Sequence, residues 1–549
     1  MKILKRYLSI ILIIICVILI FSGCVEKKDD ISTISQKNRY LMYDIGNLPD
    51  DLSKTDVNSS RVRELERILF QGLVYDKEDN NGNSSVGYAL AQNCDISKDG
   101  LVYTFTLKDN IKWSDGSDIT AQDFVDFFRG ILSQDYNSVY RYELKCIYGV
   151  SDFVSGNKDF STVAITAPKQ NVVQIRLNYP SPYFLELLAQ PMYGLRKIDS
   201  NIANWKKDYE NINYSGAFSI KEVDSSGNIL LSKNKNYVFK DSVKSNEIML
   251  ATNKNGSAYS LADFETYNNV DIFLNPPSTE IDRLKSKGEA SIFPDLSVKG
   301  LFFNFNSKNM ASNYNFREGV SLAIDRNELK NNVVGDCGEA ISSYFPKGMN
   351  LSQVKNKGII SNSQNEALKY LNNSNYNKED IIKFIYVDNE DNKKICEDIV
   401  KMINNTLAKN NNSNNKAAVV NNIKFDLQGY SSEEIGKVIK SNNYDMYLGE
   451  YNINYNSPMS FLEIWRSNSP YNKYGFKDLT YDDLMYTGDV TKDQNKKNDI
   501  YNKCIDELIK NIPVIPLYSK NTVVCSKSSI EGLKLNKFGN LLIENLQEK

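Results

Sequence analysis

Apolar residues recur along the chain with two spacings, and together these predict a mixture of strands and helices. Over 101–107 (LVYTFTL) apolar and polar residues alternate, which predicts a half-buried strand. Residues 120–123 (TAQD) have the form of a capping box, and apolar residues then recur at helical spacing over 124–132. Residues 61–75 predict a helix that ends at a turn at Gly72 and leads into a strand.

The same pattern of mixed elements continues through the second half of the chain. Residues 301–306 (LFFNFN) alternate as a strand, and 326–334 predict a helix. Residues 403–416 are rich in asparagine and predict a surface loop. Because strands and helices mix throughout, we expect an α/β protein.

The first residues of the chain have the pattern of a secretory signal peptide. Three basic residues within 1–6 precede an apolar run over 8–21, which is short for a membrane span. The small residues Ser22 and Gly23 follow, and then Cys24. With cysteine in this place the segment resembles a bacterial lipoprotein signal, although Phe21 stands where leucine is usual.

That resemblance implies removal of 1–23 and a lipid on Cys24, so that the protein is anchored to the cell membrane on its extracytoplasmic face. The polar segment 24–37 then serves as a flexible tether. An uncleaved N-terminal anchor is the alternative, and it places the rest of the chain on the same side of the membrane.

Composition narrows the function classes. The chain has 549 residues, enough for several domains, and its net charge of −2 does not favour nucleic-acid binding. It contains no histidine, which excludes enzymes that use imidazole as base or metal ligand. Six of its eight cysteines are scattered beyond Cys24 without a CxxC pair. We therefore expect isolated buried thiols, with one disulfide left open as an alternative, and neither a metal nor a cofactor.

Residues 90–129 (LAQNCDISKDGLVYTFTLKDNIKWSDGSDITAQDFVDFFR) closely resemble the signature of the large extracytoplasmic solute-binding proteins of ABC importers. These are the oligopeptide-, dipeptide- and nickel-binding class, and nickel is disfavoured here because histidine is absent. Five further segments resemble elements of that class in the same order, namely 178–197, 214–237, 301–326, 455–465 and 511–518.

The resemblance implies a two-lobed, hinged periplasmic-binding-protein fold (type II) with an extra inserted domain. Hinge strands are expected near 297–301 and 511–518. By position, lobe I comprises 38–75, 198–297 and 511–549, the inserted domain II is 76–197, and lobe III is 298–510.

The implied function is capture of peptides, above all oligopeptides, in the cleft between the lobes, and their delivery to an ABC permease and its ATPase. The protein is expected to act as a monomer and not as an enzyme. The motif 113–116 (WSDG) is interpreted as a structural turn that Trp113 packs, and Asp325 and Arg326 are expected to form ion pairs.

In peptide-binding members of the class, the ligand lies extended and pairs its main chain with strands of the lobes. The resemblance places this role on two segments. The first is Gln71, Gly72 and Leu73. The second is Glu450, Tyr451, Asn452 and Asn454. The class commonly has Glu at the first of these positions, and at the last it has an Asp that holds the ammonium group of the ligand.

Gln71 and Asn454 each place a neutral amide where the class has a carboxylate. Losing a charged partner in a dry cleft costs on the order of 2–5 kcal/mol. Our hypothesis is that the protein does not anchor a free amino terminus in the usual way, and that it takes blocked peptides or another solute. The alternative is that Glu450 or Glu463 compensates, Glu450 from the same strand face as Asn454.

Other hypotheses about the function stay open at this point. A peptide or pheromone sensor would have the same sequence features as an importer component. A hydrolase with paired carboxylates or a Ser-Lys pair has no supporting constellation, and a structural surface protein would show repeats. Tyr447, Tyr451 and Tyr455 line the ligand pocket or pack in the core.

Overall fold

The computed structural model describes residues 40–53, 60–78, 84–136, 139–308, 310–351, 354–359, 362–377, 379–409 and 422–549. The predicted signal peptide, Cys24 and the tether lie outside these residues. Within them, every helix is too short or too polar to cross a membrane.

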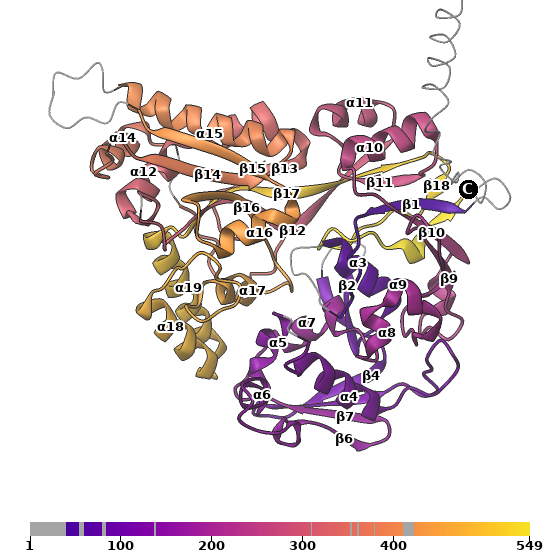
Figure 1. Ribbon diagram of the computed structural model, residues 1–549. Coiled ribbons are helices and arrows are strands. Elements are labelled where there is room, and N and C mark those ends of the chain that lie inside the picture. The colour runs from indigo at the N-terminus through magenta and orange to yellow at the C-terminus, as the bar shows by residue number, and fades with distance from the viewer. Residues whose placement is uncertain are drawn as a thin grey trace, which may run out of the picture.

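One large mixed sheet runs through two lobes (Figure 1). Its order is β15-β14-β16-β12-β17-β11-β1-β10-β9-β8, with β13 added beside β17. The two long strands at its centre, β12 (Ala290–Phe303) and β17 (Val514–Ser526), pair antiparallel along much of their length and extend into both lobes. They lie where the sequence predicts hinge strands.

Lobe I holds the strands on one side of this central pair. Strand β11 pairs with the last residues of β17, and parallel pairing then joins β11 to β1 and β1 to β10. The elements are β1 (Leu41–Gly46), β8 (Phe218–Val223), β9 (Ile229–Lys233), β10 (Glu247–Thr252), β11 (Ile272–Leu274), α3 (Ser60–Leu69), α8 (Ser200–Ala203), α9 (Trp205–Asp208), α10 (Ser257–Ala262), α11 (Ile281–Ser286), β18 (Ile530–Glu531) and β19 (Gln547–Glu548).

Lobe III holds the strands on the other side, where β16 pairs with the second half of β12. Its elements are β13 (Gly338–Ala340), β14 (Ile381–Val387), β15 (Lys424–Tyr430), β16 (Met446–Asn452), α12 (Tyr314–Ala323), α13 (Arg326–Leu329), α14 (Gln364–Asn372), α15 (Glu390–Ala408), α16 (Ser432–Lys440), α17 (Pro458–Leu462), α18 (Leu479–Val490) and α19 (Gln494–Asn511).

A smaller unit lies below lobe I in Figure 1 and corresponds to the expected inserted domain II. It has its own four-stranded sheet, in the order β4-β5-β7-β6, and a separate hairpin of β2 and β3. Its elements are β2 (Val74–Glu78), β3 (Ser84–Tyr88), β4 (Ala91–Ile96), β5 (Val102–Leu107), β6 (Ile165–Lys169), β7 (Val172–Arg176), α4 (Ala121–Leu132), α5 (Tyr140–Glu143), α6 (Val150–Val154) and α7 (Phe184–Leu188).

Several local predictions are confirmed. Helix α3 and strand β2 follow each other as the pattern over 61–75 predicts, and β5 covers 102–107. Asp123 accepts a hydrogen bond from the backbone amide of Thr120 at 2.7 Å, which is one half of the predicted capping box of α4. Trp113 is buried, and the next residue, Ser114, exchanges two hydrogen bonds with Tyr214 of lobe I. This turn therefore fastens domain II to lobe I.

Other local predictions need correction. The strand expected over 301–306 ends at Phe303, because the side chain of Asn304 turns back to the carbonyl groups of Asn442 and Tyr444. Residues 403–408 of the expected loop are helical instead, because Ile403 and Leu407 are buried and belong to α15, which ends at Ala408. Residues 410–421 lie outside the described part of the chain.

The segment 326–334 forms α13 followed by a single π-helical turn over Lys330–Val334. The ion pairs expected of Asp325 and Arg326 are absent from the described residues. Asp325 instead caps α13 by accepting from the amides of Asn327 and Glu328, and the Nε of Arg326 donates to the carbonyl of Pro516 at 2.6 Å. All six described cysteines are free thiols.

A candidate binding site between the lobes

The two central strands slip in register where the lobes meet. Pro294 of β12 lies opposite Asn521 of β17, but Val298 lies opposite Ser519, so β12 carries extra residues between these points. Such a bulge bends a strand and re-aims its side chains. The bulge, residues 295–297, therefore bends β12 where the two lobes meet.

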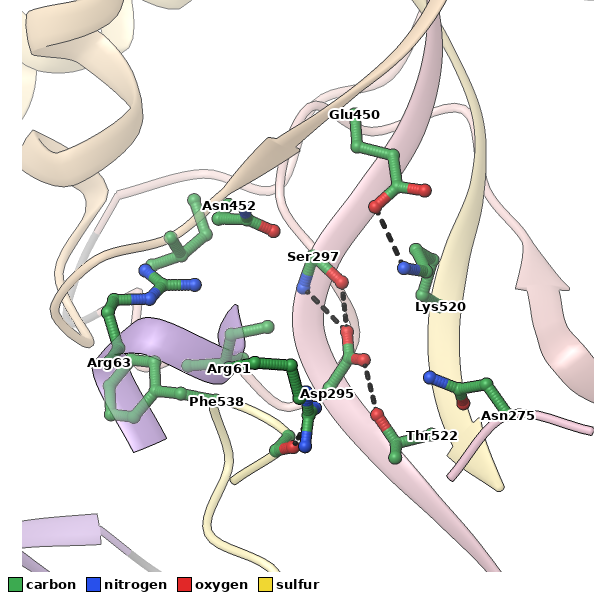
Figure 2. Close-up of a pocket in the computed structure, with 13 residues that line it drawn as sticks. Arg61, Arg63, Asn275, Asp295, Ser297, Glu450, Asn452, Lys520, Thr522 and Phe538 are labelled. Carbon is green, nitrogen blue, oxygen red and sulfur yellow. Dashed lines mark hydrogen bonds and ion pairs between the residues drawn. The ribbon is translucent and has the colours of Figure 1, made fainter. Parts of the chain in front are cut away.

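A cavity of about 60 Å³ lies against this bulge (Figure 2). Its lining comes from both lobes and from the central strands. Lobe I and the C-terminal segment contribute Arg61, Arg63, Asn275, Phe538 and Gly539; the central strands contribute Asp295, Leu296, Ser297, Lys520 and Thr522; and lobe III contributes Glu450, Asn452 and Ile453. All three parts therefore meet around this hinge cavity.

Hydroxyl groups hold the acid at the bulge. Asp295 accepts from the backbone amide of Ser297 at 3.0 Å and from the Oγ1 of Thr522 at 2.9 Å, and the hydroxyl of Ser297 also donates to it. Figure 2 shows these bonds joining β12 to β17 across the floor of the cavity. Asp295 therefore stabilises the hinge itself.

Most charges around the cavity are paired. Arg61 forms an ion pair with Glu64 at 2.5 Å and donates to the carbonyl of Gly539 at 3.1 Å. Glu450 pairs with Lys520 at 2.8 Å and with Lys299 at 3.3 Å. Desolvation in the cleft would raise the pKa of Glu450, but the two lysines outweigh it and hold that pKa at about 2.

Asn454 joins three parts of the molecule. Its Oδ1 accepts from the Nη1 of Arg63 on α3 at 3.0 Å, and its Nδ2 donates to the Oε1 of Glu143 in domain II at 3.0 Å. Its own backbone amide donates to Ser460 within lobe III at 2.8 Å. The amide group thus bridges an arginine and a carboxylate that belong to the opposite side of the cleft.

Glu143 is the acid that contacts Asn454. Its carboxylate also accepts from the hydroxyl of Tyr471 in lobe III at 2.7 Å, and from Gln190 and Tyr193 in domain II at 2.8 and 3.2 Å. Burial raises the pKa of Glu143, and these hydrogen bonds oppose that shift. No cation pairs with it among the described residues, so a neutral network satisfies this carboxylate.

Further contacts hold domain II against lobe III. Lys145 pairs with Glu463 at 2.7 Å, and the ring centroids of Tyr183 and Tyr455 lie 5.6 Å apart in a stacked arrangement. The Nζ of Lys497 donates to the carbonyl of Pro180 at 2.7 Å. These contacts bring the two sides of the cleft together in a closed arrangement.

The residues predicted for the site fall in three places. Glu450 and Asn452 line the hinge cavity. Asn454 is hydrogen-bonded to Arg63, which is one of the residues of the cavity wall. Tyr451 points away, into the core of lobe III, where its hydroxyl donates to the carbonyl of Tyr344 at 2.7 Å. Tyr455 packs against Tyr183 between domain II and lobe III, which favours packing over pocket lining as the role of Tyr455.

Gln71, Gly72 and Leu73 do not line the cavity. Their carbonyl groups accept from backbone amides at the start of domain II or at its return to lobe I, including a bond from Leu195 to Gln71 at 3.0 Å and one from Leu90 to Gly72 at 3.2 Å. The side chain of Gln71 accepts from the hydroxyl of Tyr237 at 2.9 Å. In the closed arrangement this turn connects lobe I to domain II.

The two acids expected to compensate for Asn454 are both neutralised by cations. Lys299 and Lys520 hold Glu450, while Lys145 and Arg466 hold Glu463. Glu450 also does not share a strand face with Asn454, because β16 ends at Asn452. Sequence reasoning missed Glu143, Arg63 and Lys520, although the three arginines of α3 were a visible sign of charge near the predicted turn.

The described residues contain no group of three or more acidic or cysteine side chains placed to hold a metal ion. One backbone feature of lobe III bears on ligand binding. Strand β14 pairs with β16 only through Met446–Leu448, so Glu450–Asn452 have no strand partner on that side among the described strands. That stretch of backbone can pair with an added strand.

Comparison with known proteins places this architecture in a family. The family model of the bacterial extracellular solute-binding proteins, family 5 (middle part), matches residues 85–473. The oligopeptide-binding protein OppA of Bacillus subtilis is 26% identical over 98% of this chain and 99% of its own length. The dipeptide-binding protein DppE of the same organism is 23% identical over 82% of each chain.

Solved structures share the fold. The murein tripeptide binding protein MppA of Escherichia coli superimposes with a TM-score of 0.78 at 20% identity, covering 92% of this chain and 98% of that one. The pheromone receptor PrgZ gives a TM-score of 0.77 at 21% identity, covering 93% and 99%. These relatives are binding proteins and not enzymes, and they confirm the hinged two-lobed α/β fold. The chain belongs to the bacterial extracellular solute-binding proteins of family 5.

Proposed function

We propose that this protein captures peptides between its lobes and delivers them to an ABC permease and its ATPase. In this proposal Cys24 carries the lipid that keeps the monomeric protein on the extracytoplasmic face of the cell membrane. The relatives named above bind oligopeptides, dipeptides and a murein tripeptide by their names, which supports peptides as the ligand class.

The observation that carries the proposal is the hinge cavity with its lining from both lobes. One water molecule needs roughly 10–15 Å³ of such a cavity, so its volume of about 60 Å³ holds only a few waters. A peptide therefore enters when the lobes part about β12 and β17, and the lobes then close around it. The unpaired backbone of Glu450–Asn452 offers main-chain hydrogen bonds that are indifferent to side chains.

The occupied carbonyl groups of Gln71, Gly72 and Leu73 favour lobe III as the main pairing edge. We keep these three residues in the proposed site as the turn that positions domain II, and we assign the direct ligand contacts to Glu450, Asn452 and the backbone of Tyr451.

A sensor is the second candidate function. The structural likeness to a protein named as a pheromone receptor favours it, since that receptor has the same two-lobed fold. A binding protein that signals and one that feeds an importer use the same capture step, so the two candidates differ in their partner. A non-peptide solute is the third candidate.

Native mass spectrometry of the purified protein tests the proposal. The protein is released from its ligand by partial unfolding, and the released molecules are sequenced. We expect peptides in one-to-one complexes with the protein. A non-peptide solute, or a protein that stays empty after exposure to peptide mixtures, would contradict peptide capture. Co-purification with a permease would favour import over sensing.

A further inference from the structure

Arg63 is a buried cation without a carboxylate partner. Only 5% of its surface is exposed, and its Nη1 donates to the neutral amide oxygen of Asn454 at 3.0 Å. Its Nε is buried and has no hydrogen-bond partner. No carboxylate forms an ion pair with it among the described residues. Burying a guanidinium without a counter-charge is costly.

The other cations near the cavity differ from Arg63 in this respect. Arg61 is paired with Glu64, and Lys520 and Lys299 share Glu450. Figure 2 shows the side chain of Arg63 reaching toward the strand that carries Asn452, apart from the pair formed by Glu450 and Lys520. Of these four cations, Arg63 is therefore the one that forms no ion pair among the described residues.

The acids of the site already have hydrogen-bond or ion-pair partners within the protein. Two lysines hold Glu450, and Asp295 accepts from Ser297 and Thr522. Glu143, on the far side of Asn454, already accepts from four donors. A ligand ammonium placed beside Asn454 would lie next to Arg63, and like charges repel strongly in a dry cleft.

The geometry of Arg63 matches an anionic ligand group instead. Since Nη1 is engaged by Asn454, the edge formed by Nε and Nη2 remains without a protein partner among the described residues. Two parallel N–H groups on that edge bind a carboxylate in a bidentate manner.

We propose that Arg63 binds a carboxylate of the ligand, and that the site selects peptides by an anionic group and not by a free amino terminus. This inference rests on the proposed peptide-binding function. The carboxylate is either the C-terminus of the peptide or the side chain of an Asp or Glu, and the chemistry at Arg63 is the same for both sources.

The test uses the purified, ligand-stripped protein and pentapeptide pools in matched forms. One pool has both ends free, one is N-acetylated and one is C-amidated, and each is made with either Glu or Gln at one internal position. We expect acetylation to change the dissociation constant less than about threefold. Either amidation or the replacement of Glu by Gln weakens binding at least about tenfold, and the affected pool identifies the source of the carboxylate.

Variants then assign the effect to Arg63. Arg63→Gln should abolish the discrimination between the pools, and Arg63→Lys, which keeps the charge but loses the bidentate edge, should reduce it. Arg129→Gln is the matched control, because it removes an arginine from the exposed surface of domain II. Thermal unfolding of each variant identifies any that has lost its fold, and Arg63→Lys then serves as the reporting variant.

Three outcomes overturn the inference. The first is tenfold weakening by acetylation with no effect of amidation or of Glu-to-Gln replacement. The second is unchanged discrimination in both Arg63 variants. In these two cases peptides still bind, so the proposed function stands. The third is that no pool binds in any form, which contradicts the proposed function and this inference with it.

Discussion

Arg63 of lobe I donates a hydrogen bond of 3.0 Å to the side-chain oxygen of Asn454 in lobe III. At this position the resembling class carries an aspartate that holds the ligand's ammonium group. Here a neutral amide faces an arginine, and the same amide donates to Glu143 on its other side. In our proposal the charge that a ligand meets here is therefore reversed in sign, which leads to the predictions that follow.

Replacing Asn454 by Asp should shift the ligand preference toward free-amine peptides. The new carboxylate pairs with Arg63 and removes its unmatched charge, so peptides that bind through a carboxylate weaken by about tenfold, or ~1.4 kcal/mol. Free-amine peptides gain affinity. Calorimetric titration of both peptide forms measures the shift. Asn452→Asp, two residues away in the cavity wall, is the matched control; an equal shift in that variant, or no gain for free amines, would contradict the role of position 454.

The closed state of the lobes should become less stable relative to the open state as the pH rises above 4.5, the ordinary pKa of a glutamate side chain. Burial raises the pKa of Glu143 in the closed state, whereas opening separates it from Asn454 and Tyr471, exposes its carboxyl group to water and so returns its pKa toward about 4.5. The closed state therefore binds more protons than the open state. The free energy that Glu143 contributes to closure is full below about pH 4.5 and declines as the pH rises through the raised pKa of the closed state. Fluorescence transfer between probes on domain II and lobe III, recorded from pH 4 to 8, measures the closed fraction.

Two groups bear on that pH profile. Burial also raises the pKa of Asp489, to about 6, within the network of Arg466 and Glu463. Glu143→Gln removes the titration of Glu143 and leaves that of Asp489. We expect the variant to flatten the profile, and a profile identical to that of the unsubstituted protein would show that Glu143 does not control closure.

Glu450→Gln should destabilise the hinge at neutral pH. The folded-state pKa of about 2 lies below the ordinary value of 4.5, so the carboxylate contributes stability above about pH 4.5 that is lost as pH falls toward 2. Its side chain is 36% exposed, and screening limits the loss to about 1–2 kcal/mol. Urea unfolding measures the difference in the free energy of unfolding between the variant and the unsubstituted protein. This difference should be smaller at pH 3 than at pH 7. A constant difference would mean that the lysine pairs are not its cause.

Tyr183→Ala should weaken binding of every ligand to the same extent. The ring of Tyr183 stacks on Tyr455 only when domain II and lobe III meet, so its loss raises the free energy of closure by about 1–2 kcal/mol. Dissociation constants should rise about five- to thirtyfold for all end-group forms of a peptide. A change in the ratio between the forms would show instead that Tyr183 takes part in selecting the ligand.

Cys24→Ala should release the protein from the membrane. Metabolic labelling with a radioactive fatty acid should mark the unsubstituted protein and leave the variant unlabelled. Ser22→Ala keeps a small residue before the cysteine and should retain the label. Labelling of the Cys24→Ala variant would contradict lipid attachment at this residue.

The sequence was sufficient to predict the fold because its signals are local. Alternation over 101–107 and the capping box at Thr120 depend on residues a few positions apart, and six motifs in order identified the family pattern. The strand at 301–306 was predicted too long because the turn at Asn304 depends on carbonyl groups of Asn442 and Tyr444, far along the chain.

The site was predicted only in part because its contacts are distant in sequence. Glu143 and Asn454 lie 311 positions apart, and Arg63 and Asn454 lie 391 apart. The nearby acids Glu450 and Glu463 were natural candidates to compensate for Asn454, but lysine and arginine side chains from other segments neutralise them. Occupied backbone groups at Gln71–Leu73 likewise depend on partners in domain II.

Hydrogen–deuterium exchange of the purified protein, before and after its bound peptide is stripped, tests most directly whether ligands are held at the hinge. With peptide bound, we predict protection of two segments on opposite sides of the cleft, β16 through Asn454 and helix α3 around Arg63. Protection confined to other parts of the molecule, or none at all when peptide is bound, would contradict capture at this site.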